Sequence, residues 1–296
     1  MVIEGFGGIE MLFYILSAVI LIFFIFLGYV SHKMTRPERM IGDWTPEDIG
    51  FDYEKVSFKT VDDVIIKGWW IDKGSDKTVI GLHGYTSSKW YEVYMKPLLD
   101  ILKDEDYNIL YFDFRAHGES GGKRTTIGDK EYLDLKAAVE WLGYEHSHST
   151  QKLGVIGFSM GAMTALKGSL DDRIDCVVAD SPPIDLDATS ARSMDYFAGL
   201  PSFLYHLTKP VAVLLFDIDY EDMLSYADSI DTPLLLIGGE NDPIVKLSEI
   251  REFYEINRKN DNDIKIWATE AEHVRSLKEN PNKYKDRITL FLKRNM

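Results

Sequence analysis

The sequence predicts an α/β domain with a mostly parallel sheet, helices on both of its faces, and one transmembrane helix before it. From about residue 51 onward, short runs rich in Val, Ile and Leu alternate with helical stretches. Such continuous apolar strands are typical of a parallel sheet that is buried on both faces. Ahead of this domain, residues 11–30 carry no charged side chain. At about 1.5 Å per residue, this segment is about 30 Å long as a helix, which matches the core of a bilayer.

The composition limits the kind of protein this can be. The chain has 296 residues, of which 45% are hydrophobic, enough for one large domain and an accessory segment. The formal net charge of −15 argues against nucleic-acid binding, because contacts with phosphates need a basic surface. Cys176 is the only cysteine, so an intrachain disulfide is impossible, and its apolar neighbours indicate a buried small side chain rather than a catalytic thiol.

Residues 1–32 are expected to form an uncleaved membrane anchor, and two other interpretations are weaker. A cleaved signal peptide begins with basic residues, whereas this segment contains Glu4 and Glu10 and no Lys or Arg. A core helix of a soluble protein is rarely apolar on all sides for this length. Lys33 and the two arginines that follow it lie just after the span, so the positive-inside rule places the rest of the chain in the cytoplasm.

The expected order of elements follows from the apolar patterns after a polar linker at residues 33–50. Two alternating runs at 54–60 and 64–72 are expected to pair in an antiparallel manner. The further strands are expected at 78–83, 108–113, 153–158, 174–180, 233–238 and 264–268. The helices are expected at 89–103, 129–142, 160–170, 248–257 and 281–294.

One insertion interrupts this alternation of strands and helices. The stretch between residues 180 and 233 has no strict period, and a loop of that length is expected to be functional or to have structure of its own. Because it leaves the end of a strand, residues 183–228 are interpreted as a small helical lid over an active site, within a domain that spans 51–296. The alternative is an additional packing helix that does not contact substrate.

The most informative motif is Gly157-Phe-Ser-Met-Gly161, which lies between an expected strand and an expected helix. This arrangement is typical of a nucleophile elbow, in which glycines allow a sharp turn and the central serine is exposed at the sheet edge. Ser120 lies in a second G-x-S-x-G match, but loop-forming residues follow it instead of a helix. Ser159 is therefore the predicted nucleophile.

A serine nucleophile needs a base, and the base needs a carboxylate to orient it. With a nucleophile elbow, the carboxylate and then the histidine follow the serine along the chain. His273 follows an expected strand and is the predicted base, because His206, the other histidine after the elbow, lies inside the insertion. Asp242, in the turn after the strand at 233–238, is the predicted carboxylate, and Glu240 and Asp180 are alternatives.

The oxyanion that forms during attack needs hydrogen-bond donors. The backbone N–H groups of Met160, directly after the serine, and of Tyr85, in the loop after the strand at 78–83, are the predicted donors. Gly84 allows that loop to turn inward. The side chains of His83 and His117 are interpreted as structural hydrogen-bond partners rather than catalysts.

Together these residues resemble the α/β-hydrolase superfamily over roughly residues 51–296. The opening hairpin, the Trp69-Trp70 pair and the anchor look like its membrane-anchored bacterial esterase-like branch, similar to the Bem46 and serine aminopeptidase (S33)-like groups. The matching motifs, in the family's order, are His83-Gly84, Asp113-Phe-Arg-Ala-His-Gly-Glu-Ser120, the elbow, Gly239-Glu-Asn-Asp-Pro243 and Glu272-His273.

The resemblance implies an eight-stranded sheet, a triad of Ser159, His273 and Asp242, and no cofactor. No metal site is predicted either, since His146 and His148 have a ligand-like spacing but no third ligand nearby. The size of the substrate does not transfer from the family, because the insertion is short and irregular.

The predicted function is that of a serine hydrolase that cleaves a small-molecule carboxylic ester through an acyl-enzyme on Ser159. A serine peptidase, a thioesterase and an acyltransferase would use the same residues. A tethered binding protein with an idle site is the remaining class of function. Labelling by a fluorophosphonate separates that class from the enzymes, because only an activated serine reacts.

Overall fold

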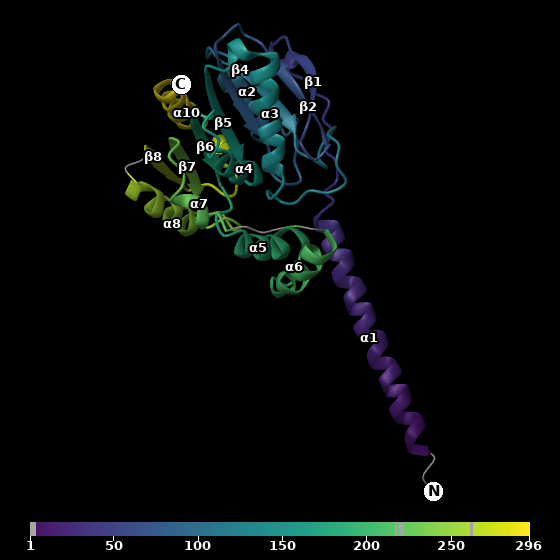
Figure 1. Cartoon of the computed structure of the whole chain (residues 1–296). Helices are drawn as coiled ribbons and strands as arrows, with labels where there is room; N and C mark the ends of the chain where they lie inside the picture. The colour runs from purple at the N-terminus through teal and green to yellow at the C-terminus, as the bar shows by residue number, and fades with distance from the viewer. Residues whose placement is uncertain (1–3, 217, 219–221, 261–262) are drawn as a thin grey trace.

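An eight-stranded sheet lies at the centre of the protein, and one long helix projects away from it (Figure 1). The computed structural model describes residues 4–216, 218, 222–260 and 263–296. Residues 1–3 of the expected anchor, and residues 217 and 219–221 of the expected lid, lie outside the described residues.

The sheet has the strand order β1-β2-β4-β3-β5-β6-β7-β8. β2 runs antiparallel to both β1 and β4, and every other neighbouring pair is parallel. The predicted opening hairpin and the mostly parallel sheet are therefore confirmed. The strands are β1 (Glu54–Lys59), β2 (Ile65–Ile71), β3 (Lys77–Leu82), β4 (Asn108–Asp113), β5 (Lys152–Phe158), β6 (Cys176–Asp180), β7 (Leu234–Gly239) and β8 (Ile264–Thr269).

Helices cover both faces of the sheet, and each face has its own apolar core. Side chains alternate along each strand, so that Val155 of β5 joins the core under α3, α4 and α8, while Ile156 joins the core under α2 and α10. The covering helices are α2 (Met95–Leu102), α3 (Glu131–Glu145), α4 (Met160–Gly168), α8 (Leu247–Asn257), α9 (Ser276–Glu279) and α10 (Pro281–Asn295). Short 3-10 helices lie at η1 (Pro46–Ile49), η2 (Ser147–Ser149) and η3 (Arg258–Asn260).

Helix α2 begins six residues later than the sequence predicts, at Met95 instead of residue 89. Lys89 is fully buried, and its Nζ lies 2.6 Å from Asp113 Oδ2 at the end of β4. Its backbone N–H also donates to Asp113 Oδ1 at 2.9 Å. These contacts hold the chain before α2 in a loop against β4, which a helical pattern in the sequence does not show.

The insertion between β6 and β7 is helical and contains α5 (Leu186–Ala198), α6 (Phe203–Phe216) and α7 (Leu224–Ala227). Helix α5 begins where the Asp185 side chain accepts the N–H of Ala188 at 2.8 Å, and it ends at Gly199, whose φ is +62°. In Figure 1, α5 and α6 lie below the sheet, next to the end of the long helix.

That long helix is α1 (Glu4–Met34), which is long and apolar enough to cross a membrane by length and composition. Its side chains from Ile9 to Phe26 are exposed along the projecting part. Burial begins at Leu27, and Val30 packs in a small cluster with Tyr205 of α6 and with two residues of α5. The last turns of the helix are thus part of the folded domain.

The expected linker differs from a free tether, because it packs on the domain along its length. Thr35 accepts the N–H of Thr125 at 3.0 Å, and Arg39 donates to carbonyl groups in the loop after β4. Trp44 is buried, and its Nε1 donates to the carbonyl of Trp90 at 2.6 Å. A single buried tryptophan among polar residues has no periodic pattern, so the sequence does not indicate this packing.

Candidate active site

Ser159 lies on a strained turn between β5 and α4, with φ of +52° and ψ of −118°. A non-glycine residue adopts this conformation only when its surroundings enforce it. A Cβ at Gly157 would collide with the carbonyl oxygen of Gly161. A Cβ at Gly161 would collide with the carbonyl oxygens of Leu82 and His83 at the end of β3. Glycine is required at positions 157 and 161, because a side chain at either position would collide with the backbone.

The three residues predicted as a triad lie in hydrogen-bond contact. Nε2 of His273 is 2.9 Å from Oγ of Ser159, and Nδ1 of His273 is 2.7 Å from Oδ2 of Asp242. Because the carboxylate can only accept, Nδ1 carries the proton and Nε2 accepts the serine hydroxyl. This is the arrangement that proton transfer from the serine to the imidazole requires.

The buried carboxylate of Asp242 is held by its own turn. Its Oδ1 accepts the backbone N–H groups of Ile244 at 2.8 Å and Val245 at 2.9 Å, which leaves Oδ2 for the imidazole. Glu240, the nearby alternative, is exposed and lies 3.8 Å from Arg251. The structure therefore brings Asp242, and not Glu240, to the histidine.

Asp180, the other alternative, lies at the end of β6 and is fully buried. Its Oδ1 accepts the hydroxyl of Ser181 at 2.9 Å, and its backbone carbonyl accepts the N–H of Ser159 at 2.8 Å. Burial raises the pKa of this carboxyl to about 6. Asp180 thus supports the elbow through its backbone, while the imidazole contacts Asp242.

The predicted oxyanion donors lie on the two segments that meet at the elbow. Met160 is the first residue of α4, and Tyr85 lies in the loop after β3. That loop passes directly against the nucleophile, because a Cβ at Gly84 would lie 3.3 Å from Cβ of Ser159. Tyr94, which the sequence analysis missed, holds this loop by accepting the N–H of Gly84 at 2.9 Å.

His83 and the serine of the second G-x-S-x-G match, Ser120, make structural contacts. His83 is buried, with Nδ1 bonded to the carbonyl of Gly84 at 2.7 Å and Nε2 accepting the N–H of Phe114 at 3.0 Å. Burial lowers its pKa well below the usual range, which keeps the imidazole neutral. Ser120 is buried and accepts the N–H of Lys67 at 2.9 Å.

The structure also bears on His206 and on metal binding. His206 is exposed on α6, where its ring lies 5.6 Å from that of Tyr205, and it does not line the site. Among the residues that the structure describes, no group of three or more His, Cys, Asp or Glu side chains is placed to hold a metal ion.

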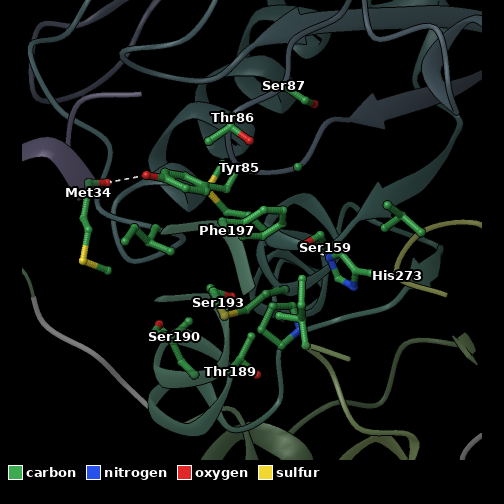
Figure 2. A pocket seen from close by; sticks show the side chains of 18 of the residues that line it. Met34, Tyr85, Thr86, Ser87, Ser159, Thr189, Ser190, Ser193, Phe197 and His273 are labelled. Atoms are coloured by element: carbon green, nitrogen blue, oxygen red, sulfur yellow. Dashed lines mark hydrogen bonds between the residues drawn. The ribbon is translucent and has the colours of Figure 1, made fainter. Parts of the chain in front are cut away.

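A cavity of about 170 Å³ lies over Ser159 and His273 and is lined mainly by apolar side chains. Figure 2 shows Thr189, Ser190 and Ser193 of α5 along one side of it, and Phe197 of the same helix between Tyr85 and Ser159 in this view. Met34, the last residue of α1, also lines the cavity. The sequence offers no signal for this residue, because it lies at the end of an apolar span more than a hundred positions before the nucleophile.

The end of α1 is bonded to the loop that carries a predicted oxyanion donor. The hydroxyl of Tyr85 donates to the carbonyl of Met34 at 2.7 Å, as the dashed line in Figure 2 shows. Burial raises the pKa of Tyr85 to about 12, so the hydroxyl stays protonated and remains a donor. The Tyr85 side chain therefore connects the long helix to the site.

The sheet order, the strained serine and its contacts define an α/β-hydrolase fold with a Ser-His-Asp arrangement at the elbow. The family model described as alpha/beta hydrolase fold matches residues 77–209. The chain is 30% identical over 238 residues to the uncharacterized protein YqkD of Bacillus subtilis, a match that covers 77% of this chain and 75% of YqkD. The chain thus belongs to the α/β-hydrolase family.

Two further proteins are similar to this chain over most of its length. The esterase Pf2001 of Pyrococcus furiosus is 51% identical, with a TM-score of 0.79, and the match covers 88% of this chain and 100% of the esterase. The uncharacterized membrane protein YNL320W of Saccharomyces cerevisiae is 26% identical over 215 residues, covering 71% of this chain and 70% of the yeast protein. The similarity to the esterase supports a hydrolase.

Proposed function

We propose that this protein is a membrane-anchored serine hydrolase that cleaves carboxylic esters through an acyl-enzyme on Ser159. The observation that carries the proposal is the continuous chain of hydrogen bonds from Ser159 through His273 to Asp242. The strained elbow fixes the position of Ser159, and two backbone N–H groups hold the buried carboxylate of Asp242. The three side chains are therefore oriented before any substrate binds.

In the first half of the proposed reaction, Oγ of Ser159 attacks the ester carbonyl carbon while its proton passes to Nε2 of His273. Asp242 keeps the imidazole oriented and stabilises the imidazolium that forms. The N–H groups of Met160 and Tyr85 donate to the oxyanion of the tetrahedral intermediate. His273 then returns the proton to the leaving alcohol, and the acyl group stays on the serine.

In the second half, a water molecule takes the place of the alcohol. His273 accepts a proton from the water as its oxygen attacks the acyl carbon, and the same N–H groups stabilise the second oxyanion. Collapse of this intermediate releases the acid, and the imidazole returns its proton to Ser159. The histidine thus acts as base and then as acid in each half.

Two observations support an ester with an apolar acyl group. The cavity over the serine is about 170 Å³ and mainly apolar, which suits an acyl chain more than a polar or extended peptide. The similar protein from Pyrococcus furiosus is an esterase. A series of p-nitrophenyl esters of increasing acyl length, compared with a thioester and a peptide anilide, tests this choice of substrate.

The proposal also includes the division of the chain. Residues 1–32 form the anchor, and residues 51–296 form the hydrolase domain with its lid. The apolar helix and the membrane-protein relative in yeast support an anchor. The basic residues after the helix support a domain on the cytoplasmic side. Digestion of the domain by an impermeant protease added to intact cells would contradict that orientation.

A fluorophosphonate probe tests the nucleophile in the full-length protein. We expect the wild type to be labelled and Ser159→Ala to be unlabelled, with ester hydrolysis reduced by several orders of magnitude. Ser120→Ala is the matched control, because it removes the serine of the other G-x-S-x-G motif and should retain labelling. Labelling that is lost in Ser120→Ala but retained in Ser159→Ala would refute the assignment.

A further inference from the structure

The lid helix α6 presents an apolar face to the solvent. Its exposed side chains recur at helical spacing, from Phe203 and Leu207 through Pro210 to Leu214. Lys209 is the only residue of α6 with a charged side chain apart from His206, which is charged only when protonated. A surface helix normally turns its polar residues outward, so an apolar outer face marks a site of contact with another apolar phase. We call these four side chains, with exposed Phe197 and Tyr196 of α5, the lid face.

The opposite side of α6 is already occupied, so the lid face cannot turn inward. Tyr205, Thr208 and Ala212 are buried on that side. The hydroxyl of Ser31 on α1 donates to the carbonyl of Thr208 at 3.1 Å. Tyr205 packs with Val30 of α1 in the cluster that joins α1, α5 and α6. The orientation of α6 is therefore set by its contact with α1.

The position of this contact matches the edge of a bilayer. The exposed part of α1 without a charged side chain runs from Met11 to Phe26, which is about 24 Å at about 1.5 Å per residue. This length is most of the thickness of a hydrocarbon core, which is about 30 Å. From Leu27 onward, α1 is packed on the lid. The lid face thus begins where the span ends, and Figure 1 shows α6 next to this end of α1.

Three basic side chains lie near the same junction. Lys33 and Arg36 are exposed at and just after the end of α1. The guanidinium of Arg124 lies 3.8 Å from the ring centroid of Phe216, at the end of α6. These cations stand out because the whole chain carries a formal net charge of −15. They complement the anionic headgroups of a membrane leaflet, whereas they would repel one another if two copies met at this face.

The catalytic cavity extends to the same junction. Met34 of α1 and Phe197 of the lid face both line it, together with Ser159. Phe197 is 66% exposed, so the cavity wall continues into the lid face. In Figure 2, Met34 and Ser159 lie at opposite sides of the space that these residues surround. An acyl chain that enters beside Met34 would come from the membrane side of the domain.

We propose that the lid face lies on the leaflet of the membrane that α1 spans, and that the substrates are lipid-like esters whose acyl chains enter the cavity from this leaflet. This inference rests on the proposed function, because it needs the anchor and the ester chemistry. It adds a membrane contact beyond the anchor and a class of substrate that is dissolved in the bilayer.

A fluorescent probe on single cysteines tests the membrane contact in the full-length protein. The native Cys176 is buried, so introduced cysteines are labelled selectively. The environment-sensitive NBD dye is attached at Leu214→Cys, on the lid face, and at Tyr144→Cys, on α3. These sites are matched, with 84% and 86% of the side chain exposed. A third probe at Ile20→Cys reports insertion of α1.

The labelled proteins are reconstituted in phosphatidylcholine vesicles with a minor share of phosphatidylglycerol and a lipid that carries a doxyl quencher high on its acyl chain. We expect the probes at Leu214→Cys and Ile20→Cys to be quenched and the probe at Tyr144→Cys to remain bright. Quenching at Ile20→Cys without quenching at Leu214→Cys would overturn this inference and leave the anchor intact. No quenching at Ile20→Cys would overturn the anchor as well.

The same measurement distinguishes a membrane from a second copy of the chain as the surface that covers the lid face. If the emission from Leu214→Cys shifts to the blue without quenching, and the shift depends on protein concentration, a second copy of the chain covers the lid face. That result would overturn the membrane contact. Quenching that persists at low protein-to-lipid ratio supports it.

An activity comparison tests the substrate class. Leu207→Glu combined with Leu214→Glu places two charges on the lid face and changes no residue that lines the cavity. We expect hydrolysis of p-nitrophenyl laurate dissolved in vesicles to fall about tenfold or more, because burying charged groups in the apolar phase is unfavourable. Hydrolysis of p-nitrophenyl acetate in water should stay within about twofold, which also reports that the variant is folded.

The matched control is Tyr144→Glu combined with Leu290→Glu, which places two charges on other exposed apolar sites. It should leave both activities unchanged. An equal loss on both esters in the lid-face variant, or no loss on either, would overturn the inference about substrate entry. A wild type that is inactive on both esters would instead refute the proposed ester hydrolysis on which the inference rests.

Discussion

Replacing Asp180 by Asn should stabilise the protein without removing its activity. The carboxyl of Asp180 is fully buried, and its pKa is raised from 3.8 to about 6, mainly because burial disfavours the charged form. Asn has nearly the same shape and can still accept the hydroxyl of Ser181, which lies 2.9 Å from Oδ1 in the wild type. The substitution therefore removes a buried negative charge and retains this contact.

The magnitude follows from the shift in pKa. The folded protein binds the Asp180 proton more tightly than the unfolded chain, so the free energy of unfolding falls as pH rises from about 4 to about 6. A shift of about 2 pKa units corresponds to about 3 kcal/mol of lost stability at higher pH. We expect Asp180→Asn to be more stable by up to this amount above about pH 6, and to differ little from the wild type near pH 4.

Denaturant unfolding of the full-length protein in detergent measures this difference. Tryptophan fluorescence follows unfolding in wild type and variant at several pH values between about 4 and about 8, across the interval in which the buried carboxyl ionises. A stability difference that does not change with pH would refute the reasoning, because the effect would then not arise from the ionisation of Asp180.

Activity gives a second and independent outcome. Asp180→Asn should hydrolyse p-nitrophenyl esters at close to the wild-type rate, since His273 contacts Asp242 and not Asp180. Asp242→Asn is the comparison, and a loss of roughly ten-thousandfold in kcat is expected because the imidazole loses its orienting carboxylate. If the two variants lose activity equally, the assignment of Asp242 as the sole orienting carboxylate is wrong.

Three further predictions concern the base and the end of α1. Ester hydrolysis should rise with pH to a plateau, because His273 must be neutral to accept the serine proton; a rate that is flat from about pH 5 to about 9 would argue against this base. Tyr85→Phe removes the hydrogen bond to Met34 and should lower the free energy of unfolding by about 1 kcal/mol, measured by denaturant unfolding beside the wild type. A chain that starts at residue 27 should retain activity, because it keeps the packed end of α1. A chain that starts at residue 42 lacks this packing and should melt more than about 4 °C lower. Equal Tm values for the two truncations would show that this packing does not stabilise the domain.

The sequence by itself determined the features that depend on local physics. Strand β5, the glycines beside Ser159 and the start of α4 are visible because a buried strand, a tight turn and a helix each impose residue types on neighbouring positions. The order of serine, carboxylate and histidine along the chain then indicated His273 and favoured Asp242, with Glu240 and Asp180 as alternatives. The apolar length of α1 was equally plain, since a bilayer imposes it on consecutive residues.

Only the tertiary structure decided which distant segments meet. Lys89 lies in a loop and not in the expected helix, because its side chain is paired with Asp113. The expected linker packs on the domain, because Trp44 is buried and bonded to the carbonyl of Trp90. The contact of Met34 with Tyr85, and its place in the cavity wall, join residues that no periodicity connects. Contacts of this kind depend on shape and burial in the assembled fold, and a single residue that makes them leaves no repeating pattern in the sequence.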